Sequence, residues 1–337
     1  MNSRERIKAI IAGKPADRCG LWIGNPLPET WPLLHAHFGT SAEEALRQQL
    51  HDDFRWFHAG PAYKHPEGKP IFNMQRKGEC HGEAGPFAEC NDVRQVEDFE
   101  WPNPDYLDFS GVLKQLANTG DVYRAGGLWS PFFHEVANFF GMENYFVKMH
   151  THPEIVHAVT RHVVDFYLEA NNRFFGQAGN VVDAFFFGND FGTQLDLLIS
   201  PDAFNEFIFP YFRQLTDLGH RHGLQVILHS CGAIHKVIPS LIRLGVDALH
   251  PLQARAVNMD ANTLARDFRE RIAFIGGIDT QDLLIHATPE AVKAEVRRVK
   301  NLLGPRFVVS PSHEAILPNV PPGNLQAMAE AAIEPEA

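Results

Sequence analysis

Residues 224–232 read LQVILHSCG, an apolar run that ends in a histidine, a serine, a cysteine and a glycine. The preceding segment, residues 200–223, opens with Ser200 and Pro201 and closes on Gly223, which are start and stop signals of a helix. An amphipathic helix that leads directly into a short apolar run is typical of a βα unit. This stretch therefore predicts a buried parallel strand with polar side chains at its carboxyl end.

The same alternation repeats from about residue 120 to the end of the chain. A second helical segment, residues 288–304, opens with Thr288 and Pro289 and closes on Gly304. Because no GxGxxG motif follows a strand, βα units over this length favour a single-domain (β/α)8 TIM barrel, residues 1–337, over a doubly wound sheet. The apolar runs are DVYRAGGLW (121–129), NVVDAFFFGND (180–190), LQVILHSCG (224–232), VDALHPLQ (246–253), IAFIGGID (272–279) and RFVVSPSH (306–313), and RCGLWIGN (18–25) supplies a further strand.

Residues 60–110 interrupt the alternation. This segment is rich in glycine, proline and polar residues, which indicates hairpins or a lid inserted early in the barrel. Cys80, His81 and Cys90 lie within it as potential ligands of a structural ion, but their spacing matches no standard zinc finger. We therefore expect free thiols in the inserted region.

Charge and composition disfavour several classes of partner. The net charge of −11 repels phosphate backbones and anionic membrane surfaces, so a small-molecule substrate is expected rather than nucleic acid or a membrane. The charged start MNSRERIKAI and the lack of a long apolar run predict neither a signal peptide nor a membrane span, and cytoplasm is the default location. Four cysteines at unrelated spacings fit a reducing compartment, and we expect no disulfides.

Polar residues at the strand ends are the candidates for a functional site, because the chemistry of a (β/α)8 barrel lies at its C-terminal mouth. Side chains alternate along a strand, so His229 and Cys231 share one face, which points into the barrel. An imidazole and a thiolate can bind one zinc ion, and His313 reaches the same end of the last strand as a third ligand. The alternative is that Cys231 is an ordinary buried thiol.

Three acids and two further residues complete the candidate site. Asp190 or Asp279 could supply an oxygen ligand or orient an imidazole, and Glu314 adjoins His313. A turn role for Asp190, and bonds to loop amides for Asp279 and to backbone groups for Gln253, are the structural alternatives. The early tryptophans, with Trp129 the last of them, could line a mouth for a flat macrocycle or pack beneath the lid.

Several stretches resemble the uroporphyrinogen decarboxylase superfamily, which also contains methylcobalamin-dependent thiol methyltransferases. The resemblance covers nearly the whole chain, is densest in its last third and implies a (β/α)8 barrel. The stretches that carry it are RERIKAIIAGKPADR (4–18), EDFEWPNPD (97–105), HSCGAIHKVIPSLIRLGVDALHPLQ (229–253), IAFIGGIDTQDLL (272–284), ATPEAVKAEVRRV (287–299) and SPSHEAILPNVPPGNLQAMAEA (310–331).

Two departures from the decarboxylase pattern favour the methyltransferase branch. The loop that is rich in arginine in decarboxylases reads LWIGNPLPETW (21–31) here, and FHAGPAY (57–63) lacks the aspartate that contacts the pyrrole groups. A site for a polyanion needs clustered cations. The methyltransferase branch carries HxC at the position of His229 and Cys231, and a third zinc ligand, usually cysteine, where this chain has His313.

The resemblance thus implies a zinc-dependent methyltransferase that moves a methyl group between a corrinoid and a zinc-activated thiol or similar acceptor. The chain has no DxHxxG corrinoid signature, so methylcobalamin is expected on a partner corrinoid protein or as a transient ligand at the mouth. The implied roles are metal ligand for His229, Cys231 and His313, catalysis for Asp190, Asp279 and Glu314, and cofactor binding for Gln253 and Trp129. A decarboxylase of a carboxylated substrate and a non-enzymatic tetrapyrrole-binding protein are the alternatives.

Overall fold

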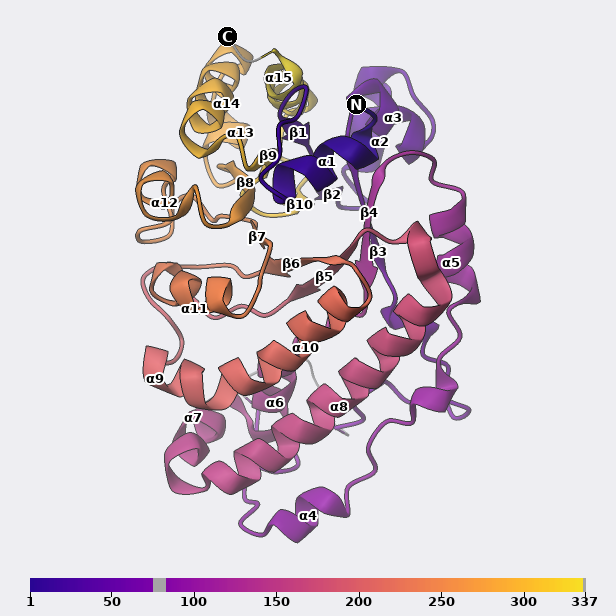
Figure 1. Cartoon of the computed structure of the whole chain (residues 1–337), viewed down its shortest axis with the longest axis vertical. Coiled ribbons are helices and arrows are strands. Elements are labelled where there is room, and N and C mark those ends of the chain that lie inside the picture. Colours follow the sequence, from indigo (N-terminus) through magenta and orange to yellow (C-terminus); the bar gives the residue numbers. More distant parts are fainter. Residues whose placement is uncertain (75–82, 336–337) are drawn as a thin grey trace.

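The structure is a computed structural model that describes residues 1–74 and 83–335. Its centre is an eight-stranded parallel sheet in which β3 to β9 pair in chain order and β9 pairs with β1 (Figure 1). This arrangement is the predicted (β/α)8 barrel, and each of the six apolar runs contains one strand. The strands are β1 (Gly20–Leu21), β3 (Phe54–His58), β4 (Tyr123–Gly127), β5 (Ala184–Gly188), β6 (Gln225–His229), β7 (Ala248–His250), β8 (Ala273–Ile278) and β9 (Phe307–Pro311).

Helices connect the strands and surround the barrel (Figure 1). The predicted helix start at Ser200 is present, because its side chain accepts a hydrogen bond from the Ala203 N–H, and Thr288 caps α14 in the same way. Among the helices of the described residues, none combines the length and apolar character that crossing a bilayer requires. The α-helices are α1 (Ser3–Ile11), α2 (Trp31–Phe38), α3 (Glu43–Gln49), α4 (Val93–Glu97), α5 (Ser110–Ala117), α6 (Phe132–Phe140), α7 (Met142–Thr151), α8 (Pro153–Ala178), α9 (Pro201–Ala203), α10 (Phe209–Arg221), α11 (Ile238–Arg243), α12 (Ala261–Phe268), α13 (Leu283–His286), α14 (Pro289–Leu303) and α15 (Pro322–Ile333).

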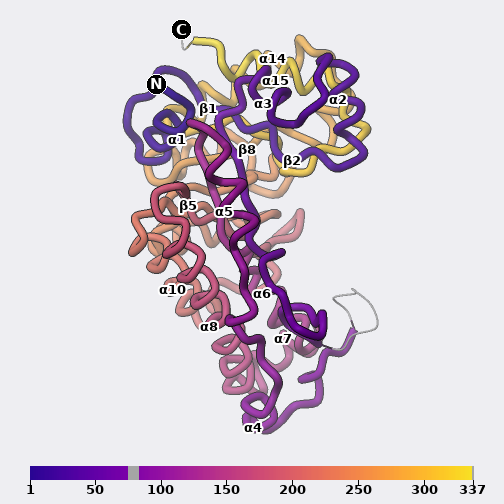
Figure 2. The backbone as a smooth tube through the Cα atoms, turned by 90° about the vertical axis from the view of Figure 1, so that its right-hand side faces the viewer, coloured from indigo at the N-terminus to yellow at the C-terminus, as the bar shows by residue number. Residues whose placement is uncertain are grey.

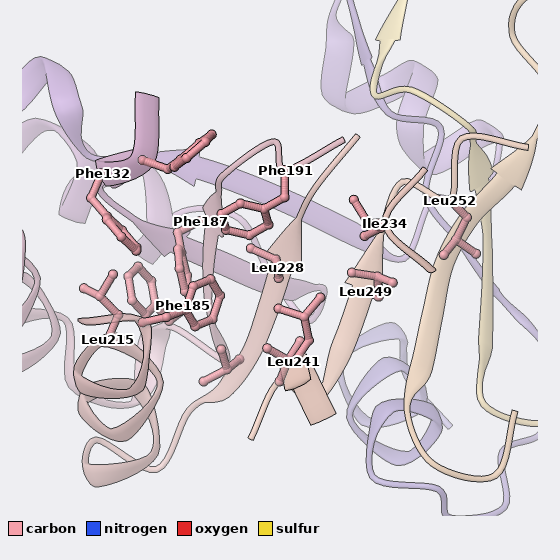
Figure 3. Close-up of a cluster of buried hydrophobic side chains, with 14 of the residues drawn as sticks. Phe132, Phe185, Phe187, Phe191, Leu215, Leu228, Ile234, Leu241, Leu249 and Leu252 are labelled. Carbon is pink, nitrogen blue, oxygen red and sulfur yellow. The ribbon is translucent and has the colours of Figure 1, made fainter. Parts of the chain in front are cut away.

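The two faces of the barrel strands form separate cores. Outward-facing side chains such as Phe185 and Leu228 pack against Leu215 of α10 and Leu241 of α11 (Figure 3). Inward-facing side chains form a second cluster within the barrel, which includes Phe54, Tyr123, Ala184, Phe186, Ile227, Ala248, Ile275 and Val308. Because Ile227 faces inward, His229 two residues later also faces inward, as the alternation predicts.

Asp53 bridges the two ends of the sheet, β1 and β3. Its N–H donates to the carbonyl oxygen of Leu21 at 2.9 Å, and its Oδ2 accepts from the Leu21 N–H at 3.0 Å. The buried carboxylate also pairs with Arg6 at 2.7 Å and with Arg18 at 2.8 Å. The barrel is therefore nearly closed. Between β1 and β3, a buried cluster of ion pairs takes the place of the continuous backbone hydrogen bonding that joins the other neighbouring strands.

The described parts of the inserted segment, residues 60–74 and 83–110, extend from the barrel along the long axis of the molecule. Its helix α4 lies at one end of this axis in both views, and α14 and α15 lie at the other (Figures 1 and 2). Trp101 stacks on His162 of α8 with ring centroids 4.6 Å apart, which anchors the segment. Within 60–74 and 83–110 the β pairing consists of one isolated bridge, Tyr63 to Leu107, and no hairpin forms. Action as a lid remains a prediction.

The thiols of the described residues agree with the expectation of free cysteines. Cys19, Cys90 and Cys231 form no disulfide bond with one another, and Cys19 and Cys90 are buried. Cys80 and His81, the other members of the predicted cysteine and histidine group, lie outside the described residues. The described part of the inserted segment thus provides Cys90 alone from that group.

Candidate metal centre

The turn after β6 fixes the position of Cys231 at the mouth of the barrel. The Cys231 N–H donates to Asp190 Oδ1 at 2.8 Å, and the Gly232 N–H donates to Gln253 Oε1 at 2.8 Å. Gly232 has a φ of 89°, a conformation that disfavours other residues, and a Cβ there would overlap the Gly192 carbonyl. As a result Cys231 Sγ lies 3.3 Å from His229 Nε2.

His250 of the neighbouring strand lies directly beside His229. The two residues are in register between β6 and β7, and their Nδ1 atoms are 3.0 Å apart. The imidazole of His250 is fully buried, and the rings of Trp22 and Phe186 lie 5.0 Å and 5.3 Å from it. Burial, and to a smaller extent the imidazoles of His229 and His313, hold the pKa of His250 well below its ordinary value. His250 is therefore neutral at physiological pH.

Sequence reasoning missed His250 as a site residue. It lies inside the apolar run VDALHPLQ, where Gln253 was taken as the polar strand end. The strand ends three residues earlier, at His250, and Pro251 follows. Since proline cannot donate to a strand ladder, Pro251 was the available signal that β7 ends at His250.

Two carboxylates approach His229 from opposite sides. Asp190 Oδ1 lies 3.5 Å from its Nε2, and Glu314 Oε2 lies 3.5 Å from its Nδ1. Glu314 Oε2 is buried and accepts no hydrogen bond from a described residue. The ligand atoms of two groups, Asp190 with His229 and Cys231, and His229 with His250 and Glu314, lie within 4.8 Å of one another. The site thus combines nitrogen, sulfur and oxygen donors.

His313 lies next to these groups but belongs to neither. Its ring centroid is 6.3 Å from that of His229, and the two rings are perpendicular. Its Nδ1 accepts from the Ala315 N–H at 3.2 Å and lies 3.6 Å from Glu314 Oε2. While Nδ1 accepts this hydrogen bond, the ring proton of His313 lies on Nε2, so metal binding through Nε2 requires the ring to release the Ala315 N–H.

Asp279 and Gln253 bind backbone N–H groups, which is the structural role that the sequence offered as the alternative to a role in the site. The Asp279 carboxylate accepts from the N–H groups of Gln281 and Leu283 at 3.0 Å and 3.1 Å and lies outside both ligand groups. Gln253 supports the Cys231 turn through Gly232. Their catalytic and cofactor-binding roles stay predictions.

Trp129 forms a wall of the site. Its ring lies 5.1 Å from that of His229 in an edge-on arrangement and 5.1 Å from that of Trp56. Gly188 at the end of β5 provides the room, because a Cβ there would overlap the Trp129 indole. Packing inside the barrel thus holds Trp129, the candidate cofactor-binding tryptophan, against the imidazole of His229.

We expect Gly188→Ala to destabilise the protein by about 1–3 kcal/mol, because the added methyl group displaces the Trp129 indole from a packed site. Urea denaturation and tryptophan fluorescence measure the two effects. The matched control is Gly176→Ala in α8, where nothing lies within 4 Å of the added Cβ and a small gain in stability is expected. Equal stability of the two variants, with unchanged fluorescence, would contradict this packing.

A cleft of about 450 Å³ opens beside the site. Gln253 and His313 form the side of the cleft that adjoins the Cys231 turn. The remaining lining is uncharged and is formed by Thr280, Gln281, Ile285, Ala315, Leu317, Asn319 and Val320. This volume suits a small-molecule ligand.

Electrostatics keep the Cys231 thiol protonated when no cation is present. Burial raises the pKa of Cys231 well above its ordinary value, and the carboxylates of Asp190 and Glu314 raise it further. Only an added positive charge would favour the thiolate in this environment. The surroundings of Cys231 therefore suit a metal ligand better than a free nucleophile.

Fold and site together define a (β/α)8-barrel protein with two groups of side chains near the carboxyl ends of its strands that could hold a metal ion. The family model of uroporphyrinogen decarboxylase (URO-D) matches residues 85–335, and the chain belongs to this family. Among solved structures, a methyltransferase from Methanosarcina mazei is similar in fold, with a TM-score of 0.68, 16% sequence identity and 98% of each chain covered. No curated protein matches the chain.

Proposed function

We propose that the protein is a zinc-dependent methyltransferase of the uroporphyrinogen decarboxylase superfamily, which moves a methyl group between a corrinoid and a zinc-activated thiol or similar acceptor. Membership of the family supports the scaffold, and the likeness to a methyltransferase supports methyl transfer as its reaction. The proposal of a zinc ion depends on one observation: Cys231 Sγ and His229 Nε2 lie 3.3 Å apart at the barrel mouth, where one ion could bind both atoms.

The proposed zinc ligands are His229, Cys231 and His313, of which His229 and Cys231 already converge. An imidazole that binds a metal through Nε2 carries its proton on Nδ1 and needs an acceptor there. Nδ1 of His229 faces His250, and Nδ1 of His313 faces Glu314 Oε2, which lacks a donor among the described residues. Asp190 is an alternative third ligand, since its Oδ1 already lies 3.5 Å from His229 Nε2.

Zinc at this position would supply a Lewis acid that lowers the pKa of a bound thiol, near ~8.5 when free, so that a thiolate is available for methyl transfer. The side chains of this protein hold and orient the ligands. Asp190 fixes the Cys231 backbone, and Glu314 orients an imidazole. Trp129 excludes water from one side of the site, and the cleft beside His313 admits the substrate.

We propose that methylcobalamin reaches this mouth on a partner corrinoid protein or as a transient ligand, with Trp129 and Gln253 beside it. The segment at 60–110 is proposed as a lid over it. For decarboxylation of a polyanionic porphyrinogen the described groups around His229 are unsuited, because they include the carboxylates of Asp190 and Glu314 where cations would be needed.

Methyl loss from methylcobalamin in the presence of varied thiols, followed by absorbance, tests the function. We expect turnover by zinc-loaded protein, loss of turnover after chelation and recovery when zinc is restored. Full activity of the metal-free protein would overturn the role of zinc. Tight binding of methylcobalamin without methyl loss, with every thiol tried, would favour a non-enzymatic binding protein instead.

Zinc affinity is expected to rise by about tenfold for each unit of pH, because binding displaces the proton of the Cys231 thiol. The sign follows from the raised pKa of Cys231, which leaves the thiol protonated at neutral pH, so that a lower proton concentration favours the zinc-bound form. Competition with a chelator of known pH dependence measures the slope, and a weakly buffered titration counts the proton released. An affinity that does not change with pH would contradict a thiol ligand.

A further inference from the structure

His250 contacts the metal centre from inside the barrel. Its Nδ1 lies 3.0 Å from Nδ1 of His229, and no described residue forms a hydrogen bond with its Nε2. The ring is fully buried between Trp22 and Phe186, so it cannot turn toward solvent to satisfy either nitrogen. The contact with His229 is thus the hydrogen bond that fixes the orientation of His250.

The direction of this hydrogen bond decides which nitrogen of His229 can bind a metal. One proton fits across the 3.0 Å contact between the two Nδ1 atoms, so one Nδ1 donates and the other accepts. If His250 donates, His229 carries its own proton on Nε2 and cannot bind a metal there. If His229 donates, its Nε2 presents a lone pair toward Cys231 Sγ, 3.3 Å away.

Two features of the site favour His229 as the donor. Cys231 Sγ lies 3.3 Å from Nε2 of His229, so a metal ion shared by these two atoms would take the Nε2 lone pair and leave the His229 proton on Nδ1. Glu314 Oε2 is the other acceptor near this proton, but at 3.5 Å it is the more distant one. The remaining proton of His250, on Nε2, faces the aromatic rings of Trp22 and Phe186, which are weak acceptors.

We propose that His250 is the positioning residue of the metal centre: its Nδ1 accepts the Nδ1 proton of His229 and thereby directs the Nε2 lone pair of His229 to the metal beside Cys231. The part that concerns metal rests on the proposed function. The close approach of the two imidazoles does not, because the register of β6 and β7 sets it.

Two variants separate the hydrogen bond from the packing. His250→Phe keeps a ring of similar size and removes the acceptor, whereas His250→Asn places an amide oxygen where the imidazole Nδ1 was. His220→Phe, on α10 at the opposite end of the barrel, is the control for replacing a histidine. Zinc affinity is measured by chelator competition, thermal unfolding in chelator verifies the fold, and ¹⁵N spectra of the metal-free protein locate the His229 proton, with His229→Ala for assignment.

We expect His250→Phe to bind zinc about 10–100-fold more weakly than the wild type, which is the usual effect of losing an outer-shell partner. His250→Asn should recover most of this loss, and His220→Phe should bind normally. Wild-type affinity in folded His250→Phe would overturn the inference and leave the zinc site intact. If the wild type binds no zinc, the proposed function fails, and the ¹⁵N spectrum decides: a proton on His229 Nδ1 supports the inference, and a proton on Nε2 overturns it.

Discussion

Replacing Cys231 with serine is expected to remove bound zinc and abolish methyl transfer. Cys231 Sγ is one of two ligand atoms already converged at 3.3 Å, and a hydroxyl group does not ionise under conditions in which a thiol does. The loss of affinity should exceed the ~10–100-fold effect of losing an outer-shell partner. Metal analysis and chelator competition on protein purified without chelator measure it.

Cys19→Ser is the matched control for Cys231→Ser. Cys19 is a buried cysteine whose Sγ donates to the Phe307 carbonyl at 3.1 Å, at the far end of the barrel from the mouth, and serine can keep that bond. The Cys19 variant should bind zinc and transfer methyl groups like the wild type. Equal zinc content in both variants would contradict the role of Cys231.

Asp53→Ala is expected to destabilise the protein by about 3–5 kcal/mol, the usual cost of breaking a buried ion pair. The substitution leaves the buried guanidinium of Arg6 with the exposed Asp17 as its remaining carboxylate partner. It also removes the acceptor of the Leu21 N–H at the seam between β1 and β3. The midpoint of urea denaturation measures the change.

Asp17→Ala removes a carboxylate from the same arginine at the surface, where 41% of the Asp17 side chain is exposed. Because exposed ion pairs contribute little, we expect a loss of ~0–1 kcal/mol. A similar small loss for Asp53→Ala would mean that the seam does not depend on the buried carboxylate.

The sequence predicted the barrel because its strands are short apolar runs between capped helices, and it predicted the inward direction of His229 because side chains alternate. It missed β3, because FRWFH carries an arginine and a histidine and does not read as an apolar run. Arg55 is buried there and pairs with Glu44 of the preceding helix α3, a contact that the hydrophobic pattern of the strand does not reveal.

The candidate site was predictable in part for a related reason. His229 and Cys231 are neighbours on one strand, so their pairing is local. The contact of His250 with His229 depends on the register of two strands, which becomes visible in the structure. For Asp279, the N–H groups of Gln281 and Leu283 that bind its carboxylate lie in the following turn. The sequence allowed both a role in this turn and a role in the site, and the contact with the turn becomes visible in the structure.

X-ray absorption of the zinc-loaded protein tests the central claim most directly, namely that His229 and Cys231 bind zinc. The account predicts about one equivalent of zinc with a sulfur neighbour at ~2.3 Å and nitrogen or oxygen neighbours at ~2.0–2.2 Å, and loss of the sulfur signal in Cys231→Ser. Less than about half an equivalent of zinc, or a zinc shell without sulfur, would contradict it.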